Sequence, residues 1–195
     1  MKKAIFFDFF GVICCEIAPF WFRRHFSPEE AARVKEEICS RADAGEILED
    51  EFHREISART GVAPDVVARE MQEMICINGE LRDFILRLRE RYPVYLLSNA
   101  MSSFLRRILE ENDLYPLFDR VFISAEMRVA KPSPDFFRAV LASLSLDGAD
   151  VVMIDDNEKN LAGAADAGID GILFTENGPF YRDLAKYYDI DGLVK

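Results

Sequence analysis

Residues 3–13 read KAIFFDFFGVI, and this stretch decides the fold. Its apolar run, residues 4–7, has the aromatic and branched composition of a strand buried on both faces of a parallel sheet. The run ends in Asp8, and Gly11 then allows the backbone to turn sharply. In open α/β sheets, ligands bind at the carboxyl ends of the strands. Asp8 is therefore a candidate functional residue, and capping of the following turn is its alternative role.

Composition limits the possible partners. The chain has 195 residues, of which 50% are hydrophobic, and its 16 Phe supply ample material for a core. The net charge of −11 argues against a protein that binds nucleic acid through its phosphates or that binds anionic membranes. A small phosphorylated ligand would have to be held locally, by a metal ion, a lysine or backbone amides.

The cysteines and the first residues of the sequence indicate in which cellular compartment the protein is expected. The four cysteines form no CxxC pair and predict reduced thiols: Cys14, Cys15, Cys39 and Cys76. The first residues lack the pattern of a signal peptide, and no apolar stretch approaches the roughly 20 residues that span a bilayer. We therefore expect a soluble cytoplasmic protein, and the sequence leaves open whether it is a monomer or a homodimer.

Strands alternate with helices over most of the chain. Further strands are predicted at residues 93–97, 120–124, 151–154 and 171–174, with amphipathic helices at 81–88, 101–112, 133–144, 161–165 and 180–188. The alternation predicts an α/β fold with a doubly wound parallel sheet. Residues 1–15 and 80–195 are assigned to this core domain.

The remaining segment, residues 16–79, is predicted to be a small all-helical domain inserted after the first strand. Ser27-Pro28 is a helix start signal, because a capping serine is followed by proline at the first helical position. Further helices are expected from about Glu46 and from about Pro64. Phe20, Trp21 and Phe22 follow the first turn, where the hinge of such a domain would lie. Core packing or covering of the hinge is their expected role, and lining of a substrate pocket is the alternative.

Four predicted strand ends present polar groups to one edge of the sheet. These groups are Asp8, Ser98-Asn99, the loop with Lys131, and Asp155-Asp156. The carboxylates make a hard-oxygen site suited to Mg²⁺, and the serine, asparagine and lysine supply donors for a phosphate beside it. Each group alone has a structural alternative, as a helix cap, a surface charge or a partner of a helix dipole.

With these motifs the chain resembles the haloacid dehalogenase superfamily, most of whose members are phosphatases. FFDFFGVI, LLSNA, AKPSPDFF and MIDDNEKNLAGAADAGI are similar to its four motifs, in the family's order. The resemblance implies a Rossmann-like core, an alpha-helical cap of the C1 type at the inserted segment, and Mg²⁺-dependent hydrolysis of a small phosphomonoester. The sequence is most similar to the branch with sugar-1-phosphate phosphatases and the phosphatase domain of soluble epoxide hydrolases.

The resemblance also implies a role for each matching residue. Asp8 would be the nucleophile that forms an aspartyl-phosphate, and Lys131 would keep it ionised. The Mg²⁺ ligands would be Asp8, the carbonyl of Phe10 and Asp156, with assistance from Asp155. The phosphoryl group would be bound by Phe9, Ser98, Asn99 and Lys131.

One position departs from the family pattern. Family phosphatases usually carry a second Asp two residues after the nucleophile, as general acid, and here Phe10 stands there. Loss of a general acid costs about 10²–10⁴ in rate. Three alternatives follow: a substrate whose leaving group needs little protonation, such as an anomeric sugar phosphate; another acid, either Glu16 or one from the cap; or phosphate-ligand binding without turnover.

A more distant alternative is 2-haloacid dehalogenation. Haloacid dehalogenases also lack the second Asp, because halide leaves without a proton. They need no Mg²⁺, however, and the pair Asp155-Asp156 favours a metal site.

Overall fold

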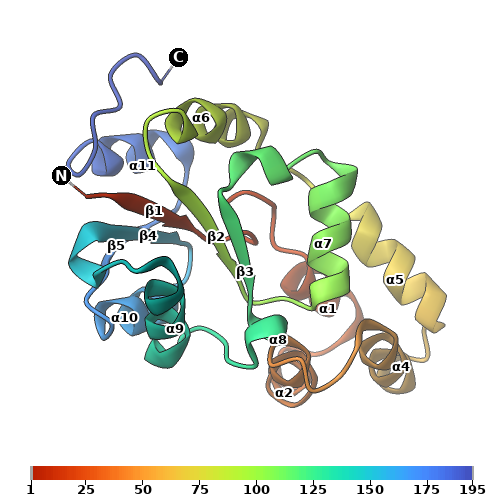
Figure 1. Ribbon diagram of the computed structural model, residues 1–195. Helices are drawn as coiled ribbons and strands as arrows, with labels where there is room; N and C mark the ends of the chain where they lie inside the picture. Colours follow the sequence, from red (N-terminus) through yellow and green to blue (C-terminus); the bar gives the residue numbers. More distant parts are fainter. Residues whose placement is uncertain (1, 195) are drawn as a thin grey trace.

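The computed structural model describes residues 2–194 and contains a five-stranded parallel sheet. In chain order the strands are β1 (Ala4–Phe7), β2 (Val94–Ser98), β3 (Arg120–Ile123), β4 (Val151–Asp155) and β5 (Asp170–Leu173). Their order in the sheet is β3-β2-β1-β4-β5, so β1 is central (Figure 1). Phe7 of β1 pairs with Leu96 on one side and with Ile154 on the other. The predicted doubly wound parallel sheet is confirmed.

Helices cover both faces of the sheet. On one face lie α6 (Gly79–Arg89), α7 (Ser102–Glu111) and α11 (Asn177–Leu184), and on the other lie α9 (Pro134–Leu144) and α10 (Glu158–Ala165) (Figure 1). β1 serves both faces, because side chains alternate along a strand. Ile5 and Phe7 belong to the larger core cluster, and Ala4 and Phe6 to the smaller one. All four are fully buried, so β1 is anchored from both sides.

Between β1 and α6 the described chain is helical. This segment contains α1 (Ala18–His25), α2 (Pro28–Val34), a π-helical turn (Lys35–Cys39), α3 (Ser40–Asp43), α4 (Glu49–Thr60) and α5 (Pro64–Glu73). We call residues 16–79 the insert. The predicted start at Ser27 is confirmed, since Ser27 Oγ accepts from the Glu30 amide and the Glu30 carboxylate accepts from the Ser27 amide.

Three short α-helices were not predicted: α1, α3 and α8 (Ser124–Met127). In α1 the buried side chains, Trp21 and Phe22, are neighbours in sequence, so the helical spacing of apolar residues is missing. Ser124, expected to end a strand, begins α8 instead. Elements of one or two turns present too few residues for a period to be visible.

The two segments that join the insert to the sheet run antiparallel to one another. The Cys15 amide donates to the Cys76 carbonyl at 2.9 Å, and the Asn78 amide donates to the Ile13 carbonyl at 2.8 Å. Between these bonds lies the bridge from Cys14 to Ile77. The insert therefore leaves and rejoins the core at one place.

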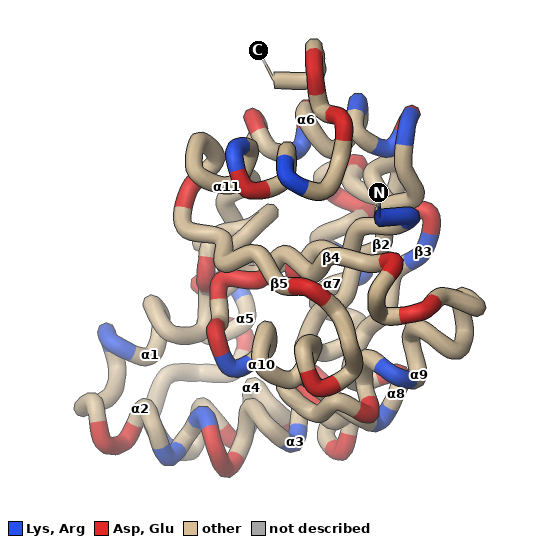
Figure 2. The backbone as a smooth tube through the Cα atoms, turned by 90° about the vertical axis from the view of Figure 1, so that its left-hand side faces the viewer, with Lys and Arg blue, Asp and Glu red and all other residues tan. Residues whose placement is uncertain are grey.

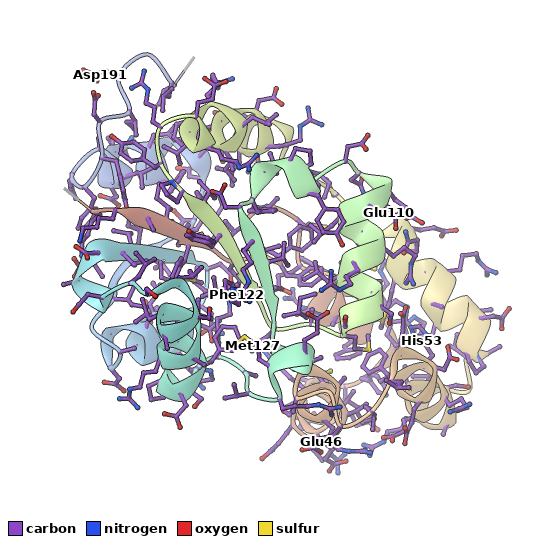
Figure 3. The ribbon with its side chains drawn as sticks, viewed as in Figure 1. Glu46, His53, Glu110, Phe122, Met127 and Asp191 are labelled. Carbon is purple, nitrogen blue, oxygen red and sulfur yellow. The ribbon has the colours of Figure 1, made fainter. Side chains whose placement is uncertain are left out.

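The insert also contacts α7 through polar side chains. The carboxylate of Glu49 on α4 accepts from Ser103 Oγ at 2.5 Å and from Arg107 Nη2 at 2.5 Å. Gln72 on α5 donates to Glu111 at the end of α7, with a distance of 2.6 Å. Figure 3 labels His53 on α4 and Glu110 on α7, the two helices that this contact joins.

Charges on the insert are mixed. Figure 2 shows basic and acidic positions interspersed along α2 and α3, so the acidic surplus of the chain does not form one continuous stretch there. All four cysteines are free thiols. Within residues 2–194 the helices are too short and too polar for any of them to cross a membrane.

Candidate active site

The candidate site lies where β1, β2 and β4 end. Asp8 directly follows β1, Ser98 ends β2 and Asp155 ends β4. These strands are parallel neighbours with β1 between the other two, so their carboxyl ends meet at one edge. Lys131 reaches the same edge from the loop between α8 and α9. Its Nζ lies 2.8 Å from Asp8 Oδ2 and 2.7 Å from Asp155 Oδ2.

The ion triad of Asp8, Lys131 and Asp155 is buried. Their exposed fractions are 7%, 4% and 0%. Burial raises the pKa of Asp8 well above its usual range, and the Lys131 ammonium opposes this shift. For Lys131, burial opposes the charged form, but the two carboxylates outweigh it and raise its pKa. The ammonium therefore stays charged and holds both acids.

The remaining oxygen of Asp8 and the two residues that follow it shape the turn. Asp8 Oδ1 accepts a hydrogen bond from the Phe9 amide at 2.6 Å. This amide was predicted to bind phosphate, and in this structure it holds the carboxylate of Asp8. The Phe10 ring stacks on Phe104 of α7, with centroids 6.2 Å apart and planes inclined by 13°. Among the described residues, no donor bonds to the Phe10 carbonyl oxygen, which leaves it available as a ligand.

Asp155 and Asp156 differ, although they are adjacent. Asp155 accepts from Lys131 Nζ, from Asn160 Nδ2 at 3.0 Å and from the Asn157 amide at 2.9 Å. Its oxygens are therefore engaged by donors of the chain, and it orients Lys131. Asp156 is half-buried and has no such set of donors in the described chain.

Gly11 brings the carboxylate of Asp156 close to the loop after β1. The φ of Gly11 is 80°, and a Cβ at this position would come within 2.1 Å of Asp156 Oδ2. Only glycine fits this combination of left-handed backbone and close approach. As a result Asp8, Asp155 and Asp156 each offer a carboxylate oxygen within 4.8 Å of the other two. Three acids against one ammonium leave a surplus of negative charge, which suits a divalent cation with oxygen ligands.

Ser98 and Asn99 play different parts. Ser98 Oγ is fully buried and has no hydrogen-bond partner among the described residues. A buried hydroxyl without a partner is costly, so it indicates a missing ligand. Asn99 instead fastens the main chain of Lys131: its Oδ1 accepts from the Lys131 amide at 2.9 Å, and its Nδ2 donates to the Lys131 carbonyl at 2.7 Å.

The structure thus brings together every residue that the sequence placed at this edge. Sequence reasoning missed Asn160, which fixes Asp155, and the positioning contact of Asn99. Asn160 lies on α10, five residues after Asp155, and this spacing gave no local signal for their contact. It also missed Asp43, at the end of α3, whose charge interacts with Lys131.

The profile of a protein family described as haloacid dehalogenase-like hydrolase matches residues 2–168. The chain belongs to this family. A solved structure of a HAD family enzyme from Bacteroides thetaiotaomicron, in complex with magnesium and inorganic phosphate, superimposes with a TM-score of 0.78 and 25% identity. The superposition covers 93% of this chain and 99% of that one. The sheet and its surrounding helices are therefore those of the family.

Two curated fungal relatives match by sequence. A drimenol cyclase from Aspergillus calidoustus is 28% identical over 78% of this chain, but the chain spans only 30% of that protein. A sesquiterpene phosphatase from Aspergillus oryzae is 24% identical over 74% of this chain and 76% of that protein. This hydrolase corresponds to one part of the first relative and to most of the second.

Proposed function

We propose that this hydrolase is a Mg²⁺-dependent phosphatase of a small phosphomonoester and that Asp8 is its nucleophile. The observation that carries the proposal is the position of Asp8, held at the end of β1 between the Phe9 amide and Lys131 Nζ. A fixed, desolvated carboxylate beside an ammonium is suited to in-line attack on phosphorus. Relatives with phosphatase names, and a structural neighbour solved with magnesium and phosphate, support the assignment.

The residues present fit Mg²⁺. We assign Asp8, the carbonyl of Phe10 and Asp156 as its ligands, all of them oxygen donors. Asp155 assists by holding Lys131, because its own oxygens are already engaged. When bound, the ion would supply positive charge that allows an anionic nucleophile and an anionic phosphate to meet.

The other residues bind the phosphoryl group during two transfers. The Ser98 hydroxyl and Lys131 ammonium donate to its oxygens, and Asn99 keeps Lys131 in place. An oxygen of Asp8 attacks phosphorus and the ester oxygen leaves, which gives an aspartyl-phosphate and an alcohol. Water then attacks the aspartyl-phosphate and restores Asp8. Donors fixed before the reaction stabilise the charge that develops in each transition state.

We assign residues 16–79 as a cap domain and the rest as the catalytic core. The insert lies beyond the carboxyl ends of the strands, where its helix α3 packs against α8 of the core (Figure 1). This position suits a domain that covers a substrate and contacts its alcohol part. Four free thiols fit a reducing compartment, and we propose that the protein acts on a phosphorylated metabolite in the cytoplasm.

Phe10 favours one further candidate, a protein that binds a phosphorylated ligand without hydrolysing it. Its ring occupies the usual place of the general acid and packs on Phe104, so it supplies no proton. A binding protein of this kind would keep the metal and phosphate contacts and lack turnover.

The test is phosphate release from a panel of anomeric and non-anomeric sugar phosphates and aryl phosphates, with and without Mg²⁺. We expect Mg²⁺-dependent release that falls about 10⁴–10⁶-fold in Asp8→Asn, since the nucleophile is lost. Asp83→Asn on the exposed face of α6 is the matched control and should keep full activity. Release that is equal in Asp8→Asn and wild type overturns the proposal. Binding of phosphate esters with no release by any variant favours the binding protein.

A further inference from the structure

The catalytic loop supplies no proton for a leaving group. The Phe10 side chain is packed against Phe104, and the neighbouring Phe9 is fully buried. An alkoxide is a poor leaving group, so an ester of an ordinary alcohol needs an acid within reach of the bridging oxygen. That acid has to come from a part of the chain that faces the strand ends.

Two acids of the insert meet this requirement, Glu16 and Asp43. Both are half-buried, and neither carboxylate accepts a hydrogen bond or forms an ion pair within residues 2–194. Other acids of the insert with similar burial are engaged: Glu49 is held by Ser103 and Arg107, and Glu70 accepts from the Trp21 indole. A half-buried acid that the fold leaves without a partner is available for chemistry.

Asp43 lies at the end of α3, which packs on α8, the helix that precedes the loop with Lys131. Two residues later Gly45 packs so tightly on α8 that a Cβ would lie 2.3 Å from the Ala125 carbonyl oxygen. The Arg128 guanidinium also donates to the Gly45 carbonyl. Three residues after Arg128 the chain reaches Lys131, so the end of α3 is anchored to the segment that delivers the catalytic ammonium.

The charges around Asp43 suit a proton donor. Burial raises its pKa to about 6. Lys35, on the π-helical turn, and Lys131 oppose the shift, and the like charge of Glu16 adds to it. The pKa of Glu16 is itself raised by burial and by the neighbouring charge of Asp156. A carboxyl with a pKa near 6 is partly protonated near neutral pH and can both give and take a proton.

We propose that Asp43 protonates the leaving group, in place of the acid that is missing at position 10. The inference rests on the proposed phosphatase function and deepens it. As the bond from phosphorus to the ester oxygen breaks, its electron pair passes to that oxygen, which takes the proton of Asp43. The products are the alcohol, the aspartyl-phosphate on Asp8 and an ionised Asp43. In the second transfer Asp43 takes a proton from the attacking water, which releases phosphate and restores both acids.

The proposal defines a substrate class. With an acid on the insert, the site accepts phosphate esters of ordinary alcohols and is not restricted to esters with acidic leaving groups. Ser98 Oγ, buried and without a partner at the same sheet edge, marks where the phosphoryl oxygens of such an ester bind.

The test compares phenyl, 4-nitrophenyl and 2,4-dinitrophenyl phosphate, whose phenols are progressively stronger acids. We expect Asp43→Asn to lower kcat/KM, which reports the steps up to departure of the phenol, about 10²–10⁴-fold on phenyl phosphate and hardly at all on the dinitrophenyl ester, whose phenol leaves without an acid. In wild type, kcat/KM on phenyl phosphate should fall as pH rises through about 6, as Asp43 loses its proton. The fall should be absent in Asp43→Asn. Glu46→Gln, an exposed neighbour labelled near the lower edge of Figure 3, is the control.

A second variant separates chemistry from folding. Phe10→Asp in the Asp43→Asn background should restore phenyl phosphate hydrolysis, and Phe10→Asn should not. An equal loss of kcat/KM on all three esters, or no loss on phenyl phosphate, overturns the role of Asp43 and leaves the phosphatase assignment standing. Absence of Mg²⁺-dependent release from all three esters in wild type overturns both.

Discussion

At the strand ends, Asp8 and Asp155 are each held by donors of the chain, whereas on the insert the carboxylates of Asp43 and Glu16 have no donor among residues 2–194. The first pair is fixed by neighbouring strands and one buried lysine, the second by the packing of short helices. The difference separates two tasks. Binding and attack require groups that are already in place, and proton transfer requires an acid that remains free to titrate.

The largest loss of stability is expected when the ion triad at the strand ends is disrupted. Lys131→Met removes the one ammonium between two buried carboxylates, so the free energy of unfolding should fall by about 3–5 kcal/mol. Urea denaturation measures the change. Lys159→Met, an exposed lysine on α10, should shift stability by less than about 0.5 kcal/mol. An unchanged urea midpoint in Lys131→Met would mean that the ion triad does not hold this edge together.

The second effect concerns the metal ligands. Gly11→Ala places a Cβ against the Asp156 carboxylate, so the carboxylate must move and Mg²⁺ affinity should fall about 10–100-fold. The rise in melting temperature with Mg²⁺ concentration measures this affinity. Gly61→Ala is the matched control, since its φ is 74° and a Cβ there meets nothing within 4 Å. It should suffer the same backbone strain and bind Mg²⁺ normally; weakened binding in both variants would assign the effect to strain alone.

A smaller effect is expected where the insert meets the core. Glu49→Gln removes the charge that holds Arg107 and should lower the free energy of unfolding by about 1 kcal/mol or less, as for a partly exposed pair. Denaturation at neutral pH, with Glu110→Gln on the exposed side of α7 as control, checks this. A loss as large as that of Lys131→Met would mean that the insert and the sheet unfold as one unit.

The same pair predicts a pH dependence. Burial disfavours the charged form of Glu49, but hydrogen bonds from Arg107 and Ser103 outweigh it, so its pKa lies below its ordinary value of 4.5. A lowered pKa in the folded state contributes stability above 4.5, and this stability is lost as pH falls through the folded value. Wild type should therefore lose its advantage over Glu49→Gln in denaturation below pH 4.5. An advantage that persists there would exclude the ion pair as its source.

The sheet edge could be predicted because each of its signals is local. A buried strand shows as an apolar run, and the rule that strand ends meet brings Asp8, Ser98 and Asp155 together. The role of Asn99 could not be predicted, because its partner Lys131 lies 32 positions away. Asp43 had no local signal either, since its place depends on α3 packing against α8 through Gly45. Contacts between short helices that are distant in sequence produce no regular spacing of apolar residues from which they could be predicted.

The pairing of residues 13–15 with 76–78 has a consequence for chain length. Because the two ends of the insert already lie side by side, a change in its length leaves the spacing of these ends, and hence the position of β1, unaltered. Each doubling of a flexible loop costs only about 0.6 kcal/mol in closure entropy. A shorter or longer segment can therefore be spliced between Cys15 and Cys76 while β1 keeps both neighbours. The core can therefore keep the same phosphoryl-binding sheet edge while a different insert contacts the alcohol part of a different substrate.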